Sequence, residues 1–146
     1  MATGSDKGVV SPTATYINTD HIVVGGQEIS NASLGHTGEI TFQTALNWSL
    51  NTGFVTVARR LGDGTNITLG ARNTLYDYLY NKFKLAQLTG IEVSGEAPGT
   101  IIAADQPDCI AVRYSNMAFG QGLDATEILV AAALSHVVVA VRYGRS

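Results

Sequence analysis

A short run of helical periodicity constrains this chain more than any other feature. Between about Thr52 and Leu61, apolar residues recur at positions i, i+3, i+4 and i+7, which is the pattern of one helix face. The residues of this face are Phe54, Val57, Ala58 and Leu61. Gly62 follows directly, and a glycine just past the last periodic residue is a helix stop signal. We therefore expect a short amphipathic helix that ends at Gly62.

Two further elements are predicted upstream of this helix. Thr41 follows a polar stretch and is the expected N-cap of a short helix that runs to about Trp48. The two predicted helices leave a break between them. Before that, residues 21–29 predict a β-hairpin, because two β-branched arms flank Gly25 and Gly26, which can supply the positive φ angles of a tight turn.

The rest of the chain is less regular. A third helix is expected over residues 68–82, with an inner face made of Ala71, Leu75, Tyr78 and Leu79. Residues 85–113 are rich in Gly, Pro and Asp, and a long irregular segment of this kind is usually functional or held by its neighbours. A last helix is expected from Asp124, which with Glu127 forms a capping-box variant. Residues 137–141 fit either a helix or a strand.

Four stretches together resemble one protein family. Residues 42–62, around Ser49-Leu50-Asn51, resemble the Ser-x-Asn region of penicillin-binding-protein transpeptidase domains. Residues 88–99 resemble the family's Thr-Gly-Ile-(acidic)-x-x-Gly-Glu signature, and residues 116–126 resemble its Gly-Gln-Gly turn. Residues 6–12 resemble the segment just after the nucleophile helix. Because the matches follow the family's order, the chain is identified as the central segment of such a domain.

The resemblance implies a fold and a domain layout. The fold would be α+β and mainly helical, the helical subdomain of a transpeptidase/β-lactamase-like fold with a short N-terminal β-hairpin. Residues 1–5 are predicted to be a start and linker, and residues 6–146 a partial transpeptidase domain. The tail at 137–146 departs from the family, which usually has a glycine-rich turn there.

The resemblance also implies a chemistry. The family transfers acyl groups from peptidoglycan stem peptides through a serine ester, takes β-lactams as pseudo-substrates, and needs no cofactor or metal. By this correspondence Ser49 would relay a proton and Asn51 would orient lysine and substrate. Gly120, Gln121 and Gly122 are candidates for substrate binding. The family also implies a bacterial cell-envelope location for the parent protein, although this chain shows no targeting signal.

Two of the family's three motifs are missing from this chain. None of its lysines (Lys7, Lys82 and Lys84) has a Ser or Thr three residues earlier, and no Lys-Thr-Gly or Lys-Ser-Gly triplet occurs. Removing the serine nucleophile from such a unit costs on the order of 10⁶ in rate, so the chain alone is predicted to be inactive. Two alternatives stay open: a minimal serine hydrolase with a recruited nucleophile, and a non-catalytic module that binds peptidoglycan or a partner.

Composition restricts the partners. The formal net charge is -3 and the 9 Lys and Arg residues form no basic stripe, which argues against nucleic acid. No apolar run is long enough to predict a membrane span. Only 14% of residues are charged, below the roughly 25% typical of globular chains. We therefore expect exposed apolar surface and self-association.

Three sets of residues also have plain structural interpretations. Ser49 and Asn51 are residue types that suit the cap of the following helix. The triplet Tyr114-Ser115-Asn116 mimics a Tyr-x-Asn motif of some β-lactam hydrolases, but it lies in the approach to Gly-Gln-Gly and is interpreted as structural. His21, His36 and His136 are too dispersed in the sequence to predict a metal site.

Overall fold

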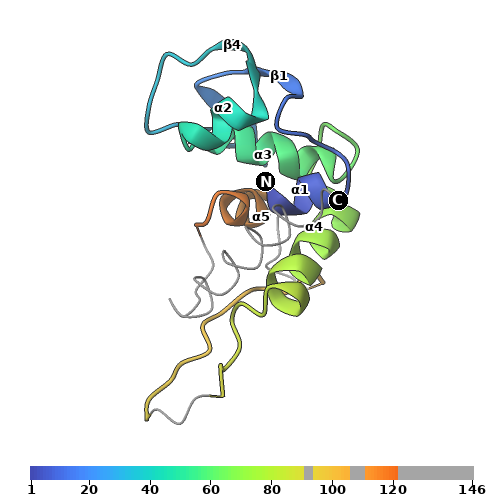
Figure 1. Ribbon diagram of the computed structural model, residues 1–146, viewed down its shortest axis with the longest axis vertical. Helices are drawn as coiled ribbons and strands as arrows, with labels where there is room; N and C mark the ends of the chain where they lie inside the picture. The colour runs from blue at the N-terminus through green and yellow to red at the C-terminus, as the bar shows by residue number, and fades with distance from the viewer. Residues whose placement is uncertain (91–93, 106–110, 122–146) are drawn as a thin grey trace, which may run out of the picture.

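The computed structural model describes residues 1–90, 94–105 and 111–121 (Figure 1). Its elements, in chain order, are α1 (Ala2–Asp6), β1 (Thr15–Asn18), β2 (His21–Val24), β3 (Gln27–Ser30), β4 (Gly38–Thr41), α2 (Phe42–Asn47), α3 (Asn51–Arg60), α4 (Leu69–Tyr76), the π-helical η1 (Asp77–Lys82) and α5 (Ala111–Ala118). This is the α+β, mainly helical fold that the sequence predicts.

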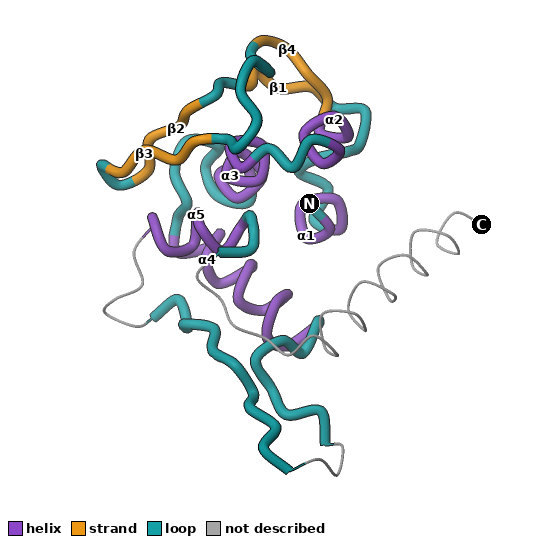
Figure 2. The backbone as a smooth tube through the Cα atoms, turned by 90° about the vertical axis from the view of Figure 1, so that its left-hand side faces the viewer, coloured by secondary structure: helices purple, strands orange, loops and turns teal. Residues whose placement is uncertain are grey.

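Helix α3 lies at the centre of the molecule. It contacts α1, α2, α4, α5 and β3, and Figure 2 shows the strands on one side of it with α4 and α5 on the other. Val55 and Ala58 enter a core cluster shared with α4 and α5, whereas Val57 enters a second cluster with Tyr16 and Leu50. The helix is therefore buried on two sides. The predicted single apolar face was incomplete, because it left out Val55.

The predicted hairpin is present as β2 and β3. The strands pair antiparallel with Val24 opposite Gln27, and Gly25 and Gly26 have φ angles of 55° and 79°. Two successive positive φ angles are what a two-residue type I′ turn needs. A Cβ on Gly25 would also lie only 2.7 Å from a methyl carbon of Val112 in α5. The hairpin tip therefore rests against α5.

A second strand pair, β1 with β4, was not predicted. Thr15 pairs with Thr41 and Asn18 with Gly38, in antiparallel register. Its strands are four residues long, and Ile17 on β1 is exposed. So short a strand carries little alternation, which explains why periodicity alone did not reveal it. The pair brings Thr41, the N-cap of α2, beside the N-terminal part of the chain.

Helix α2 begins as expected. The Thr41 hydroxyl accepts a hydrogen bond from the backbone N–H of Thr44 at 3.1 Å. The buried face of α2 is formed by Phe42 and Ala45, and the Phe42 ring stacks on Tyr16 with ring centroids 4.6 Å apart. Helix α2 is thus fixed at its start by a local cap and along its length by aromatic packing.

The third predicted helix is present but changes its winding. Thr68 caps α4 by accepting from the backbone N–H of Ala71 at 3.2 Å, and the helix continues beyond Tyr76 as η1. The predicted inner residues Ala71, Leu75 and Tyr78 are buried. The π-helical turn was not predicted, because apolar spacing does not distinguish one helical winding from another over a single turn.

The N-terminal residues, predicted in part to be a linker, are helical. Helix α1 contacts α3, and Gly4 packs so closely on Val57 that a Cβ there would lie 2.5 Å from a methyl carbon of that residue. The Tyr78 hydroxyl of η1 donates a hydrogen bond to the Asp6 carboxylate at the end of α1. Lys82 lies 3.9 Å from the same carboxylate and 3.8 Å from the centre of the Tyr78 ring.

Within the predicted irregular segment, the described residues 85–90 and 94–105 are irregular, as predicted, whereas residues 111–113 begin helix α5. Figures 1 and 2 show the chain leaving the helical body after η1, projecting away from it and returning toward α5. The Glu96 carboxylate accepts from the backbone N–H of Thr89 at 2.7 Å, which ties the outgoing part to the returning part. Hydrogen bonds from the side chain and the backbone of Thr89 lower the pKa of Glu96. Helix α5 was not predicted.

Some predictions concern residues outside the described ranges. These are Gly122, the helix expected from Asp124 and the ambiguous residues 137–141. Among the residues that the structure does describe, no helix is both long and apolar enough to cross a bilayer.

Candidate active-site segment

Ser49 occupies a strained position between two helices. Helix α2 ends at Asn47 and α3 begins at Asn51, and Ser49 has a φ angle of 52°. The left-handed region costs a residue with a Cβ about 1 to 2 kcal/mol, and such strain is concentrated at functional sites. Leu50 is fully buried in the core, whereas Ser49 is exposed. The break therefore turns the serine outward while the next residue anchors the chain.

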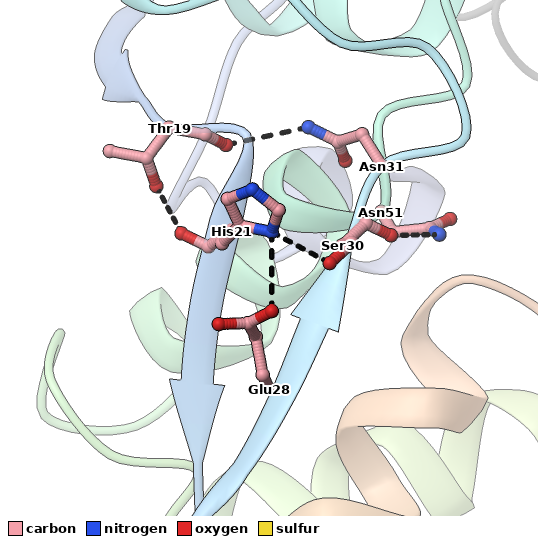
Figure 3. A network of polar contacts seen from close by, with 6 residues as sticks. All are labelled: Thr19, His21, Glu28, Ser30, Asn31 and Asn51. Atoms are coloured by element: carbon pink, nitrogen blue, oxygen red, sulfur yellow. Dashed lines mark hydrogen bonds and ion pairs between the residues drawn. The ribbon is translucent and has the colours of Figure 1, made fainter.

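Asn51 is held against the hairpin. Its side-chain amide donates a hydrogen bond to the backbone carbonyl of Ser30 at 2.9 Å, as Figure 3 shows. Asn51 lies in the first turn of α3, and Ser30 is the last residue of β3. The contact fixes the direction of the Asn51 amide from a point 21 residues earlier in the sequence.

The hairpin also carries a polar cluster close to this contact. Nδ1 of His21 lies 2.7 Å from the Ser30 hydroxyl and 3.4 Å from a carboxylate oxygen of Glu28 (Figure 3). A Ser-His-carboxylate catalytic unit needs the serine and the carboxylate on different ring nitrogens. Because both partners meet Nδ1, these three residues do not form such a unit.

A buried polar network lies directly behind the break. The Thr52 hydroxyl accepts from the Asn31 side-chain amide at 2.9 Å and donates to Oδ1 of Asn18 at 2.7 Å. Oδ1 of Asn31 in turn accepts from the backbone N–H of Thr52 at 3.0 Å. These three side chains are 1% to 5% exposed. Buried polar groups that are all paired hold one arrangement, because an unpaired member would be costly.

Tyr16 completes the network. Its hydroxyl donates to Oδ1 of Asn18 at 2.8 Å, and burial raises the pKa of Tyr16 to about 12. The side-chain amide of Asn18 donates to the backbone carbonyl of His36 at 2.7 Å. The network therefore connects β1, the end of β3, the loop before β4 and the start of α3.

Helix capping does not explain Ser49 and Asn51. The N-cap of α3 is Leu50, which makes no side-chain cap hydrogen bond. The N–H of Thr52 is instead satisfied by Asn31, which lies outside the helix. The capping interpretation was wrong for both residues, since the exposed Ser49 precedes the cap and the Asn51 amide is directed to Ser30.

An exposed tryptophan borders Ser49. The Trp48 side chain is 56% exposed, and its ring lies 4.6 Å from that of His36, centre to centre. His36 is fixed by Asn18 through its carbonyl and by the Ser33 hydroxyl, which lies 3.1 Å from Nε2. The surface next to Ser49 therefore carries two aromatic rings, and the hydrogen bonds of His36 hold one of them in place.

Gly120 and Gln121 end helix α5. The N–H of Gly120 donates to the carbonyl of Met117 and that of Gln121 to the carbonyl of Asn116, at 3.1 and 2.9 Å. With the Gly120 φ angle at 90°, this is the Schellman pattern of a glycine-terminated helix. Both residues are exposed, and Gly122 lies outside the described residues. Their proposed substrate contact stays a prediction.

The Tyr114-Ser115-Asn116 triplet is structural, as predicted. Tyr114 is fully buried and its hydroxyl donates to the carbonyl of Ile102 at 2.7 Å. The Ser115 hydroxyl donates to the carbonyl of Val112 at 2.6 Å within α5. Neither hydroxyl is exposed for chemistry on a substrate.

The fold is that of part of a penicillin-binding protein transpeptidase domain. The family model for the penicillin-binding protein transpeptidase domain matches residues 1–141, and the chain belongs to this family. Stage V sporulation protein D of Bacillus subtilis (strain 168) is 29% identical over 123 residues, which make up 84% of this chain and 17% of that protein.

Solved structures share the fold. Penicillin binding protein 3 from Mycobacterium tuberculosis, in complex with aztreonam, superposes with a TM-score of 0.73 at 25% identity, over 90% of this chain and 27% of that one. A peptidoglycan glycosyltransferase from Burkholderia ambifaria gives a TM-score of 0.77 at 19% identity, over 95% of this chain and 39% of that one. The chain thus spans well under half the length of these relatives.

Sequence reasoning missed the residues that hold the break. Ser30, Asn31 and Asn18 lie at strand ends, where polar residues are ordinary, and nothing in their spacing links them to Thr52. Only the pairing of the strands brings them to the start of α3. No sequence signal pointed to them, because Ser49 and Asn51 are residue types that could cap α3 locally.

Proposed function

We propose that this chain supplies the Ser-x-Asn side of a serine acyl-transfer site that acts on peptidoglycan stem peptides, with β-lactams as substrate mimics. The observation that carries the proposal is the exposed Ser49 in a left-handed conformation, followed two residues later by an Asn51 amide held on Ser30. Strain at an exposed serine beside an oriented amide is typical of a functional segment rather than of a connecting turn.

In the proposed reaction, a serine outside this chain attacks the stem-peptide carbonyl. As the carbon–nitrogen bond breaks, the Ser49 hydroxyl gives its proton to the leaving amine and receives one from the base that deprotonated the nucleophile. Asn51 is already oriented by Ser30 and holds the substrate or the neighbouring lysine through its amide. The protein's contribution here is position, since a group fixed before the reaction costs no ordering during it.

The chain by itself is proposed to be inactive in acyl transfer. An attacking serine needs an adjacent base, and the sequence has neither a Ser-x-x-Lys pair nor a Lys-Thr-Gly triplet. Among the residues described, no side chain forms a hydrogen bond with the Ser49 hydroxyl that could activate it. The nucleophile and the third motif would have to come from another segment. We infer the bacterial cell envelope as the place of action, from the family's substrate.

Self-association is a further part of the proposal. Ile17, Leu34, Trp48 and Leu88 are large apolar side chains that are 56% to 71% exposed. Analytical ultracentrifugation across a range of concentrations tests this. A growing dimer fraction supports it, and a single monomeric species at all concentrations contradicts it.

The experiment that tests the function combines two measurements on the chain. Intact-mass spectrometry after incubation with a fluorescent penicillin should show no adduct for the wild type. Nuclear magnetic resonance titration with a stem peptide ending in D-Ala-D-Ala should shift the Ser49 backbone and Asn51 side-chain signals, and Asn51→Ala should weaken this binding. An adduct that Ser49→Ala abolishes would make Ser49 a nucleophile, and absence of peptide binding would leave only a scaffold. Either result contradicts the proposal.

A further inference from the structure

Two adjacent residues at the end of β3, Ser30 and the following Asn31, form hydrogen bonds with the first residues of α3. Ser30 accepts from the Asn51 side chain, and Asn31 bonds the N–H and hydroxyl of Thr52. We infer that Asn31 is a positioning residue for the Ser-x-Asn motif, holding Ser49 and Asn51 in place by capping α3 from the hairpin. The capping geometry follows from the hydrogen bonds alone. The catalytic purpose of the positioning rests on the proposed function.

Helix α3 depends on this distant cap. The first N–H groups of a helix have no partner within it and are usually satisfied by the side chain of the N-cap residue. Here the N-cap is Leu50, which has no polar side-chain atom, so Asn31 provides the oxygen instead. The point at which α3 begins is therefore fixed by a residue 21 positions upstream.

The position of that start determines the conformation of Ser49. The serine lies between the buried Leu50 and the end of α2, and its N–H donates to the carbonyl of Leu46 at 3.1 Å. A left-handed serine persists only where the flanking structure leaves no easier route. With Thr52 fixed by Asn31 and Leu50 fixed in the core, the chain has to turn at Ser49.

The hairpin is held at both ends and at its tip by contacts with the helices and the preceding loop. Its other end is tied to α3 by Arg59, whose guanidinium donates to the carbonyl of Val23 at 2.7 Å. Its tip rests on Val112 of α5. Asn31 itself is 5% exposed, and its backbone N–H donates to the carbonyl of Asp20 at 3.1 Å. The residue that caps α3 is thus held by its backbone, its burial and the strand before it.

Two substitutions separate capping from packing. Asn31→Asp keeps an acceptor oxygen for the Thr52 N–H, and a negative charge at the start of a helix is favourable, although the variant loses the amide that donates to the Thr52 hydroxyl. Asn31→Leu has a similar volume but removes every hydrogen bond of the side chain. Asn73→Leu makes the same chemical change at an exposed site on α4 and is the matched control.

The test is amide hydrogen exchange with ¹⁵N resonance assignment of these variants of the full chain. Asn31→Leu should accelerate exchange of the Thr52 N–H about tenfold or more and shift the Ser49 backbone and Asn51 side-chain signals, while the Leu75 amide stays unchanged. Asn31→Asp should keep the slow exchange of the Thr52 N–H, and Asn73→Leu should match the wild type throughout. If Asn31→Leu does not fold, Asn31→Ala takes its place.

The results of these experiments distinguish failure of the positioning role from failure of the proposed function. Unchanged Ser49 and Asn51 signals in Asn31→Leu would overturn the inference, as would an Asn31→Asp variant that behaves like Asn31→Leu. The stem-peptide titration is read separately on the wild type. If the expected shifts occur and the wild type binds no peptide, the positioning role stands and the proposed function fails.

Discussion

The Tyr78 hydroxyl donates a hydrogen bond to the Asp6 carboxylate, which joins η1 to α1 across 72 residues of sequence. Tyr78 is buried, whereas the Asp6 side chain is 66% exposed, so the contact closes the edge of the core. It holds the N-terminal helix on the rest of the molecule.

Tyr78→Phe should therefore destabilise the fold. The expected loss is about 1 kcal/mol in the free energy of unfolding, at the low end for a bond to a charged group because Asp6 is well exposed to water. Urea unfolding followed by circular dichroism measures it. Tyr80→Phe is the control, since the Tyr80 hydroxyl makes no hydrogen bond with any residue that the structure describes. Equal losses in the two variants would contradict the role given to Asp6.

Stability should fall in alkaline solution through Tyr16. Burial raises its pKa to about 12 from an ordinary value of 10.0, so the folded protein keeps a proton that the unfolded chain loses. The stabilisation is complete below about pH 10 and is lost as the pH rises toward 12. Tyr78, whose pKa is raised by its bond to Asp6 and by burial, acts in the same direction.

The measurement for Tyr16 is urea unfolding at intervals between about pH 9 and pH 12. The wild-type curve should slope downward, and Tyr16→Phe should remove part of the slope while starting from a lower stability, because it also loses the bond to Asn18. Parallel slopes for the two proteins would show that the Tyr16 proton is not involved.

Two glycines in helices should respond to alanine in opposite directions. A Cβ on Gly53 would lie 2.6 Å from the Tyr16 hydroxyl oxygen and 2.7 Å from Cβ of Ala45, so Gly53→Ala should cost about 1 to 3 kcal/mol through overpacking. On Gly70 the nearest atom is 3.8 Å away. Gly70→Ala should stabilise by about 0.5 to 1 kcal/mol through helix propensity. Thermal unfolding of both variants checks the pair, and a stabilised Gly53→Ala would be incompatible with the packing around Tyr16.

Ser49→Gly should increase stability. Glycine adopts the left-handed conformation without the steric cost of a Cβ, which stabilises the folded state. Its greater entropy in the unfolded chain offsets part of this, so the net gain in the free energy of unfolding is up to about 1 kcal/mol. Ser49→Ala keeps the Cβ and should change stability by less than about 0.5 kcal/mol. Chemical denaturation compares the two. If both variants behave alike, Ser49 is not strained.

The local elements of this fold were accessible from the sequence because each has its own chemistry. Gly25-Gly26 predicts the turn of the β2–β3 hairpin, and Thr41 predicts the start of α2. The strand pair β1–β4 was not predictable in this way, since its four-residue strands gain stability from neighbours rather than from a periodic pattern. Helix α5 was missed because it begins within residues 85–113, whose Gly, Pro and Asp content predicted irregular structure.

For the candidate site, the family motif identified Ser49 and Asn51, but residues outside the motif determine their conformations. The left-handed serine and the direction of the Asn51 amide follow from Ser30 and Asn31, which only strand pairing brings to α3. Residue type alone favoured a helix cap at Ser49 and Asn51. The cap belongs to Asn31 instead, because tertiary contact competes with local preference and here prevails.

The cap that Asn31 places on α3 also has a consequence for the order of folding. A segment of residues 41–61 contains both helices and the serine between them, yet it lacks the group that decides where the second helix starts. The loop from Asn31 to Thr52 must close, at an entropic cost, before the break acquires its shape. An isolated segment of residues 41–61 is therefore expected to lack the Ser-x-Asn geometry, which is acquired only when the hairpin docks.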